Sequence, residues 1–173
     1  MTVDSRFKQL KSFIITVPDD YDHDTQISTS EGRRSNENFY LYCGGIKDEN
    51  YSKTTDRLVP GKSYEVKLLK INEVMPEDCL TFLINKKAML VGAQGLSLVW
   101  YLKKDELPKD RKKIISLDNK DALWSETGRW HMIPLVRWES AYFWCFDTDV
   151  FEASGYYGHY LLCVHEVNDI EKS

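Results

Sequence analysis

The residues whose types and spacing could support catalysis are two aspartates and a histidine, Asp118, Asp121 and His131, which lie close together in the sequence. A carboxylate that holds a histidine in one tautomer is a common arrangement in general acid–base catalysis. The same aspartates also suit a structural role, because each can accept hydrogen bonds from the amide groups of a turn. We favour this capping role and keep acid–base catalysis as the alternative.

The segment Gly92-Ala93-Gln94-Gly95 is the loop at which the sequence best supports contact with a ligand. It lies between a short apolar run and an expected helix, so its backbone amides would face an anion, with the positive end of the helix dipole behind them. The pattern lacks the lysine and serine of a P-loop and is not the dinucleotide fingerprint. A tight turn that needs glycine is therefore favoured, and a ligand site formed by Gly92, Gln94 and Gly95 is the alternative.

The basic segment 109–113 is the candidate for binding nucleic acid, and its side chains for that role are Arg111, Lys112 and Lys113. Basic residues beside aromatic ones can hold a single strand, and tryptophans follow at positions 130 and 138. The chain as a whole has a net charge of −4, which gives no general attraction to a polyanion. A solvated turn is the favoured interpretation.

The cysteines are far apart in the sequence and form no Cys-x-x-Cys pair: Cys43, Cys79, Cys145 and Cys163. In a chain long enough to build its own core, this usage predicts free, buried thiols in a reducing cytoplasm. A protein exported unfolded by a specialised secretion system would have the same cysteines. Cys163 and His165 are two residues apart on an expected strand, so they share a face. The paired spacings of a zinc site are absent, and we expect no metal and no cofactor.

Two helices are expected in the middle of the chain, at about 76–88 and 96–106. Pro76 is suited to a first helical turn, and Glu77 and Asp78 favour the positive end of the helix dipole. The second helix follows from apolar residues at helical spacing and is expected to stop at Leu107-Pro108, with a strand through Trp100 as the alternative.

Short runs of β-branched and aromatic residues predict about six to eight strands. The expected strands are Phe13–Val17, Phe39–Cys43, Tyr64–Leu68, Met89–Val91, Ile114–Leu117, Ile133–Trp138, Tyr142–Phe146 and Tyr160–Val167. The fold class is therefore α+β, a mainly antiparallel sheet with both helices packed on one face.

The 173 residues suit a single globular domain. Residues 1–11 and 168–173 are expected to be loosely ordered ends, and residues 19–38 to form a long polar loop with at most a short helix. No apolar run approaches the roughly 20 residues that cross a bilayer, and the first residues contain no apolar segment of a secretory signal.

Several of these segments occur together in a recognisable order. They are the Val91–Gly95 segment with Ser97–Trp100, then Glu106–Lys109, then Ser116–Trp124, preceded by Ile14–Tyr21 and the Leu58–Lys62 turn and followed by Leu161–Cys163. In this combination the chain resembles a family of short uncharacterised bacterial proteins, for which no activity, substrate or catalytic residue is known. Asp110-Arg111-Lys112 departs from the Gly-Lys-Trp that relatives tend to have after the Leu-Pro pair.

The leading functional hypothesis is a small, non-catalytic binding or protein-interaction module of bacterial type, acting in the cytoplasm on another protein. Ten aromatic residues between Trp130 and Tyr160 make the C-terminal strands the candidate partner surface, if enough of them are exposed. The first alternative is an enzyme or anion binder that combines the Gly92–Gly95 loop with Asp118, Asp121 and His131. The second is a nucleic-acid-binding protein.

Overall fold

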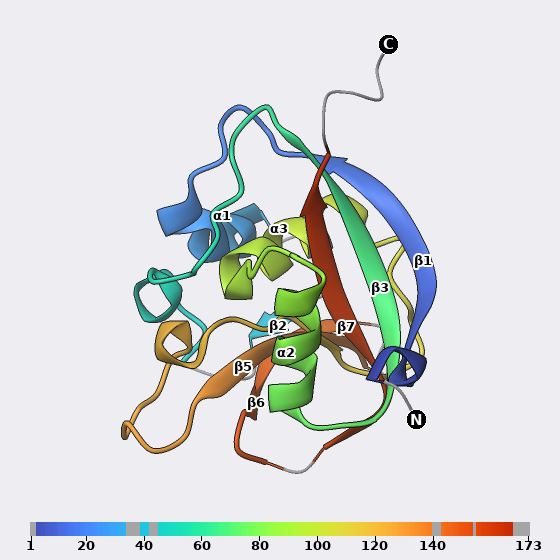
Figure 1. Ribbon diagram of the computed structural model, residues 1–173. Helices are drawn as coiled ribbons and strands as arrows, with labels where there is room; N and C mark the ends of the chain where they lie inside the picture. The colour runs from blue at the N-terminus through green and yellow to red at the C-terminus, as the bar shows by residue number, and fades with distance from the viewer. Residues whose placement is uncertain (1–2, 34–38, 42–44, 140–142, 154, 168–173) are drawn as a thin grey trace.

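One mixed sheet of seven strands, in the order β1-β3-β7-β4-β5-β6-β2, forms the centre of the protein in the computed structural model (Figure 1). The structure describes residues 3–33, 39–41, 45–139, 143–153 and 155–167. The strands are β1 (Phe7–Thr16), β2 (Phe39–Leu41), β3 (Ser63–Val74), β4 (Ile114–Ile115), β5 (Met132–Trp138), β6 (Trp144–Val150) and β7 (Tyr156–Glu166). The helices are α1 (Gln26–Arg33), α2 (Pro76–Asn85) and α3 (Gly92–Lys103). The predicted α+β class is confirmed.

Antiparallel pairing dominates the sheet, as predicted. The pairs β1–β3, β3–β7, β4–β5 and β5–β6 are antiparallel, whereas β4–β7 and β2–β6 are parallel. The alternation of apolar and polar residues from Tyr64 to Leu68 explains why this part of β3 keeps a regular register with both neighbours, because a shift of one residue would turn its buried side chains toward water.

Strand β1 begins at Phe7, six residues before the expected strand, and its register shifts between Gln9 and Lys11. Residues 7–11, which we expected to be loosely ordered, pair with β3 instead. The ring of Phe7 stacks on that of Phe82 in α2, with centroids 3.9 Å apart, and this contact holds the start of the strand. The other expected loose end, 168–173, lies outside the described residues.

Hydrophobic side chains pack on both faces of the sheet, and this differs from the expectation that both helices share one face. On β7, Leu161 and Cys163 belong to the cluster that contains α2 residues, whereas Leu162 and Val164 belong to the cluster that contains α3 residues. Because successive side chains of a strand point to opposite faces, α2 and α3 lie on opposite sides. All five residues from Tyr160 to Val164 are buried, as a strand covered on both faces requires.

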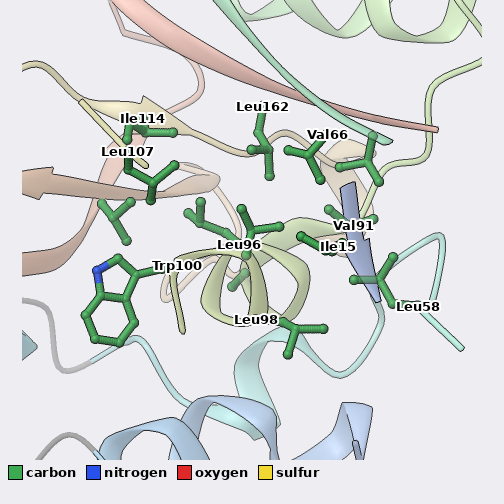
Figure 2. Close-up of a cluster of buried hydrophobic side chains, with 14 of the residues drawn as sticks. Ile15, Leu58, Val66, Val91, Leu96, Leu98, Trp100, Leu107, Ile114 and Leu162 are labelled. Atoms are coloured by element: carbon green, nitrogen blue, oxygen red, sulfur yellow. The ribbon is translucent and has the colours of Figure 1, made fainter. Parts of the chain in front are cut away.

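Helix α3 begins at Gly92, four residues earlier than expected, so the Gly92–Gly95 segment is its first turn. The amide of Gly95 donates to the carbonyl of Val91 at 3.0 Å, as in a continuing helix. A Cβ atom on Gly95 would lie 2.3 Å from Cβ of Val91, so only glycine fits there. Figure 2 shows Leu96 of this helix facing side chains of the sheet such as Leu162, while Leu98 lies on the opposite side of the helix.

Segment 86–91 carries the chain from α2 to α3, and its only sheet pairing among the described residues is the bridge between Met89 and Val164. The expected strand at Met89–Val91 is therefore a single pair, in which Met89 N donates to Val164 O at 2.8 Å. In the polar stretch 19–38, a short helix is present as α1. Every helix in the described part of the chain is too short or too polar to cross a bilayer.

Candidate functional site

The three residues predicted to form a ligand loop, Gly92, Gln94 and Gly95, are buried inside the protein. The side chain of Gln94 is fully enclosed and makes two hydrogen bonds to distant parts of the chain. Its Nε2 donates to Oδ1 of Asp48 at 2.8 Å, and its Oε1 accepts from the amide of Ile27 at 3.0 Å. Gln94 thus joins α3 to the start of α1 and to the 3₁₀ turn that contains Asp48.

Asp118 is also buried, at 1 % exposure, and lies beside the first turn of α3. A Cβ atom on Gly92 would come within 2.9 Å of Asp118 Oδ2. The carboxylate accepts hydrogen bonds from the amide and hydroxyl of Thr55 and from the amide of Asn119. Burial raises the pKa of Asp118 to about 6, although these hydrogen bonds oppose the shift. Asp118 therefore lies beside Gly92, as the predicted site would require, but both residues are buried in the interior.

The other two residues of the predicted acid–base group lie elsewhere. Asp121 is exposed on the 3₁₀ turn Lys120–Ala122. His131 contacts Glu152: its Nδ1 lies 2.7 Å from Oε1, and its amide donates to Oε2 at 3.0 Å. Glu152 was not among the predicted site residues, because it follows a strand twenty-one positions further on and nothing in the spacing connects it to His131.

The basic segment 109–113 is largely engaged with the protein's own acidic and aromatic side chains. Lys113 forms an ion pair with Asp149 at 2.6 Å. Lys109 lies 4.9 Å from the ring centroid of Trp138, so one of the two tryptophans considered with this segment is indeed beside it. Nζ of Lys112 lies against the backbone of β7 at Gly158, and Arg111 is exposed.

Most of the C-terminal aromatic residues belong to the core. Those buried are Trp144, Phe146, Phe151, Tyr156 and Tyr160. Trp138 and Phe143 are partly buried, and Trp130 and Tyr157 are exposed, with 44 % and 71 % of their surfaces accessible. Tyr142 lies outside the described residues. A partner surface on this sheet is therefore confined to a small area, and Trp130 is the side chain that lies at a cavity.

That cavity has a volume of about 590 Å³ and lies beside the ends of β5 and β6. We call it the tryptophan pocket; its lining residues are Trp124, Glu126, Thr127, Trp130, Met132, Val150, Glu152 and Ala153. Its volume falls in the range of about 300–1,000 Å³ that is usual for ligand sites, and aromatic and aliphatic side chains form most of its wall.

Hydrogen bonds fix the frame of the tryptophan pocket. The amide of Met132 donates to the carbonyl of Trp124 at 2.8 Å, which closes the loop 125–131 at its base. The amide of Phe151 donates to the carbonyl of His131, also at 2.8 Å, and ties the same loop to the end of β6. On its other side Trp124 packs closely against Gly45, where a Cβ atom would overlap the indole ring.

Glu152 connects the pocket wall to two basic groups. Its Oε1 lies 2.8 Å from Lys120 Nζ, in addition to its contacts with His131. Partial desolvation alone would raise the pKa of Glu152, but the hydrogen bonds from Lys120 and His131 outweigh it and lower the pKa to about 2. Glu152 is thus ionised at neutral pH, and its carboxylate is engaged by Lys120 and His131. This suits a structural carboxylate and not a general base.

The rim of the tryptophan pocket carries charges of both signs. Glu126 is exposed and lines the cavity. The guanidinium of Arg129 lies 4.8 Å from the ring centroid of Trp130, in a cation–π contact that holds the indole in place. Among the described residues, no group of three or more His, Cys, Asp or Glu side chains could hold a metal ion.

Comparisons with protein-family models, with curated proteins and with solved structures each returned no match. The resemblance to short bacterial proteins therefore stays a prediction.

Proposed function

We propose that this protein is a small, non-catalytic binding module, and that the tryptophan pocket holds an apolar side chain of a partner polypeptide. The observation that carries the proposal is the cavity of about 590 Å³ between Trp124 and Trp130, on a surface where the remaining C-terminal aromatic side chains are mostly buried. A partly exposed tryptophan at a preformed cavity gives a partner a large apolar area at a small entropic cost.

The residue types of the pocket support a polypeptide as the ligand. Tryptophan, methionine and arginine are enriched in protein interfaces, and tryptophan and arginine carry much of the binding energy at hot spots. Trp130, Met132 and Arg129 are gathered at this one place. Glu126 and Arg129 offer opposite charges at the rim, which suits a segment with charged residues on both sides of an apolar anchor.

The context proposed for this binding is the bacterial cytoplasm. The sequence resemblance supports a bacterial origin. Cys79, Cys145 and Cys163 are free, buried thiols, and such thiols are typical of a reducing compartment.

A peptide-display selection tests the proposal. Random peptides would be selected on the wild-type protein, and the affinity of each enriched peptide would then be measured on Trp130→Ala and on Tyr157→Ala. Tyr157 is the matched control, because it is an exposed aromatic residue that does not line the pocket. We expect the peptides to share one apolar position and to bind Trp130→Ala about 30-fold more weakly, the loss typical of a hot spot.

The control variant should change the affinity by less than about twofold, as exposed substitutions outside an interface do. Enriched peptides that bind wild type and Trp130→Ala equally would place the interface elsewhere. Selection of no peptide, together with binding of small apolar compounds that shift the signals of Trp124 and Trp130 in NMR spectra, would replace the polypeptide with a small molecule.

A further inference from the structure

A second cavity, of about 360 Å³, lies on the α2 side of the sheet, away from the tryptophan pocket. Its wall is formed by Phe7, Gln9, Lys67, Leu69, Phe82, Lys86, Cys163 and His165. The cavity therefore brings together a thiol, an imidazole and two ammonium groups. None of these side chains takes part in the binding function proposed above.

Cys163 and His165 lie in direct contact at this cavity. Two residues apart on β7, they point to the same face, and Sγ of Cys163 is 3.3 Å from Nε2 of His165. Only 2 % of Cys163 is exposed, so the thiol lies at the inner end of the cavity, while His165 is partly exposed. The buried thiols of Cys79 and Cys145 do not line this cavity and serve as internal references.

Charge at the cavity favours an anionic reactant. Lys67 and Lys86 both line it, and Lys86 Nζ lies 5.6 Å from the ring centroid of Phe82. Lys67 is also paired with Glu65 at 3.1 Å, so part of its charge is compensated. Lys86 directly follows α2 as its C-terminal cap, is exposed at the mouth of the cavity, and is the lysine whose charge a reactant would meet first.

We propose that Cys163 is a thiol-modification site, that His165 accepts the thiol proton, and that the reactant is a small anionic disulfide. In the reaction the proton moves from Sγ of Cys163 to Nε2 of His165, and the thiolate attacks one sulfur of the disulfide. The disulfide bond of the reactant breaks as the new S–S bond to Cys163 forms. The released thiolate then takes the proton from His165, so that the disulfide is the oxidant and no other reactant is needed.

The protonation state of His165 suits a proton acceptor, whereas the raised pKa of Cys163 opposes formation of the thiolate. Burial lowers the pKa of His165, and Lys67 adds to the effect, so the ring is neutral at pH 7 and can accept a proton. Burial raises the pKa of the Cys163 thiol to about 11, with Lys67 and Lys86 opposing the shift. A thiol that is protonated at neutral pH needs a base for rapid attack, and the imidazole at 3.3 Å is in the position to act as one.

The test follows disulfide exchange on the full chain with two probes, the dianionic 5,5′-dithiobis(2-nitrobenzoate) and the neutral bis(2-hydroxyethyl) disulfide. Peptide mapping by mass spectrometry assigns the label to each of the four cysteines. We expect Cys163 to react at least about tenfold faster than Cys79 and Cys145. We expect His165→Gln to slow Cys163 by about 100-fold and to remove the loss of rate that the wild type shows when His165 becomes protonated.

Lys86→Gln separates the charge effect from the base effect. It should slow the dianionic probe and leave the rate with the neutral probe unchanged. Equal labelling of Cys163, Cys79 and Cys145 would overturn the proposal, and so would a Cys163 rate and pH profile that His165→Gln leaves unchanged. If His165→Gln does not fold, the proposal is tested by the rate with the dianionic probe divided by the rate with the neutral probe. An equal ratio in the wild type and in Lys86→Gln would refute the anionic site.

Discussion

Replacement of Gln94 by alanine is expected to destabilise the protein markedly, because the side chain links three separate parts of the fold. Gln94 is fully buried, and its amide donates to Asp48 at 2.8 Å and accepts from the amide of Ile27 at 3.0 Å. The first bond involves a charged acceptor and contributes about 1.5–3 kcal/mol, and the second contributes about 0.5–1.5 kcal/mol. The amide of Ile27 keeps its bond to Asp48 at 2.9 Å, which limits the loss.

The free energy of unfolding should therefore fall by about 2–4 kcal/mol in Gln94→Ala. For a domain of this size, each kcal/mol shifts Tm by about 2–4 °C, so we expect a decrease of about 5–15 °C. Thermal and urea unfolding followed by circular dichroism measure both quantities. Gln9→Ala is the matched control, since Gln9 is exposed on β1, and its Tm should stay within about 2 °C of wild type.

A second substitution at the same position tests the hydrogen bond to Asp48 separately. Gln94→Glu keeps the shape but replaces the donor to Asp48 with a second carboxylate. The pKa of the introduced carboxyl should be raised in the folded protein, so its stabilising, protonated form is present at low pH and is lost as pH rises through that pKa. Gln94→Glu should thus recover stability relative to wild type on acidification from pH 7 to pH 5. If Gln94→Ala has the same Tm as the wild type, the structural role of Gln94 is refuted. Its side chain would then be available for a ligand.

Two further substitutions test the interior around α3. The pKa of Asp118 is about 6 in the folded protein, above its ordinary 3.8, so its contribution to stability is complete below about pH 4 and is lost as pH rises through about 6. Relative to Asp118→Asn, the wild type should lose up to about 3 kcal/mol between pH 4 and pH 7 in urea unfolding, and a constant difference would contradict the shifted pKa. Gly95→Ala would place a Cβ atom 2.3 Å from Cβ of Val91, and it should cost about 3 kcal/mol. Gly128→Ala, with open space around it but φ of +73°, should cost only about 1 kcal/mol, and similar Tm values for the two variants would refute the packing role of Gly95.

Local signals in the sequence predicted the elements that depend on neighbouring residues. Pro76 with two following acids marks the start of α2, and the period-two pattern from Tyr64 to Leu68 marks β3. The sequence did not indicate the start of α3, because every residue from Gly92 to Trp100 is buried. A helix that is buried on all sides has no polar face and therefore lacks the 3.6-residue alternation of apolar and polar residues. Its glycines indicated a turn, whereas Gly95 is needed for contact with Val91 inside the helix.

The candidate site could not be predicted for a different reason. A polar residue in an apolar setting can bind a ligand or satisfy a backbone group far away in the sequence, and spacing does not distinguish the two. Gln94 and Asp118 take the second role, through Ile27 and Thr55. Trp124 and Trp130, conversely, are large apolar residues that the sequence alone would assign to the core, but they line a cavity.

Stability measurements can separate these two kinds of residue before any partner is known. Trp130 is 44 % exposed, so just over half of its surface is covered by the rest of the fold. Trp130→Ala should lower the free energy of unfolding by about 1–3 kcal/mol, in proportion to the apolar area that the indole buries. Gln94→Ala removes a much smaller side chain but should cost at least as much, because it leaves Asp48 with one donor fewer in the interior. A cost that follows the buried apolar area at Trp130 but exceeds it at Gln94 would identify Gln94 as a structural residue, and the affinities of the selected peptides for Trp130→Ala then test the proposed binding role of Trp130.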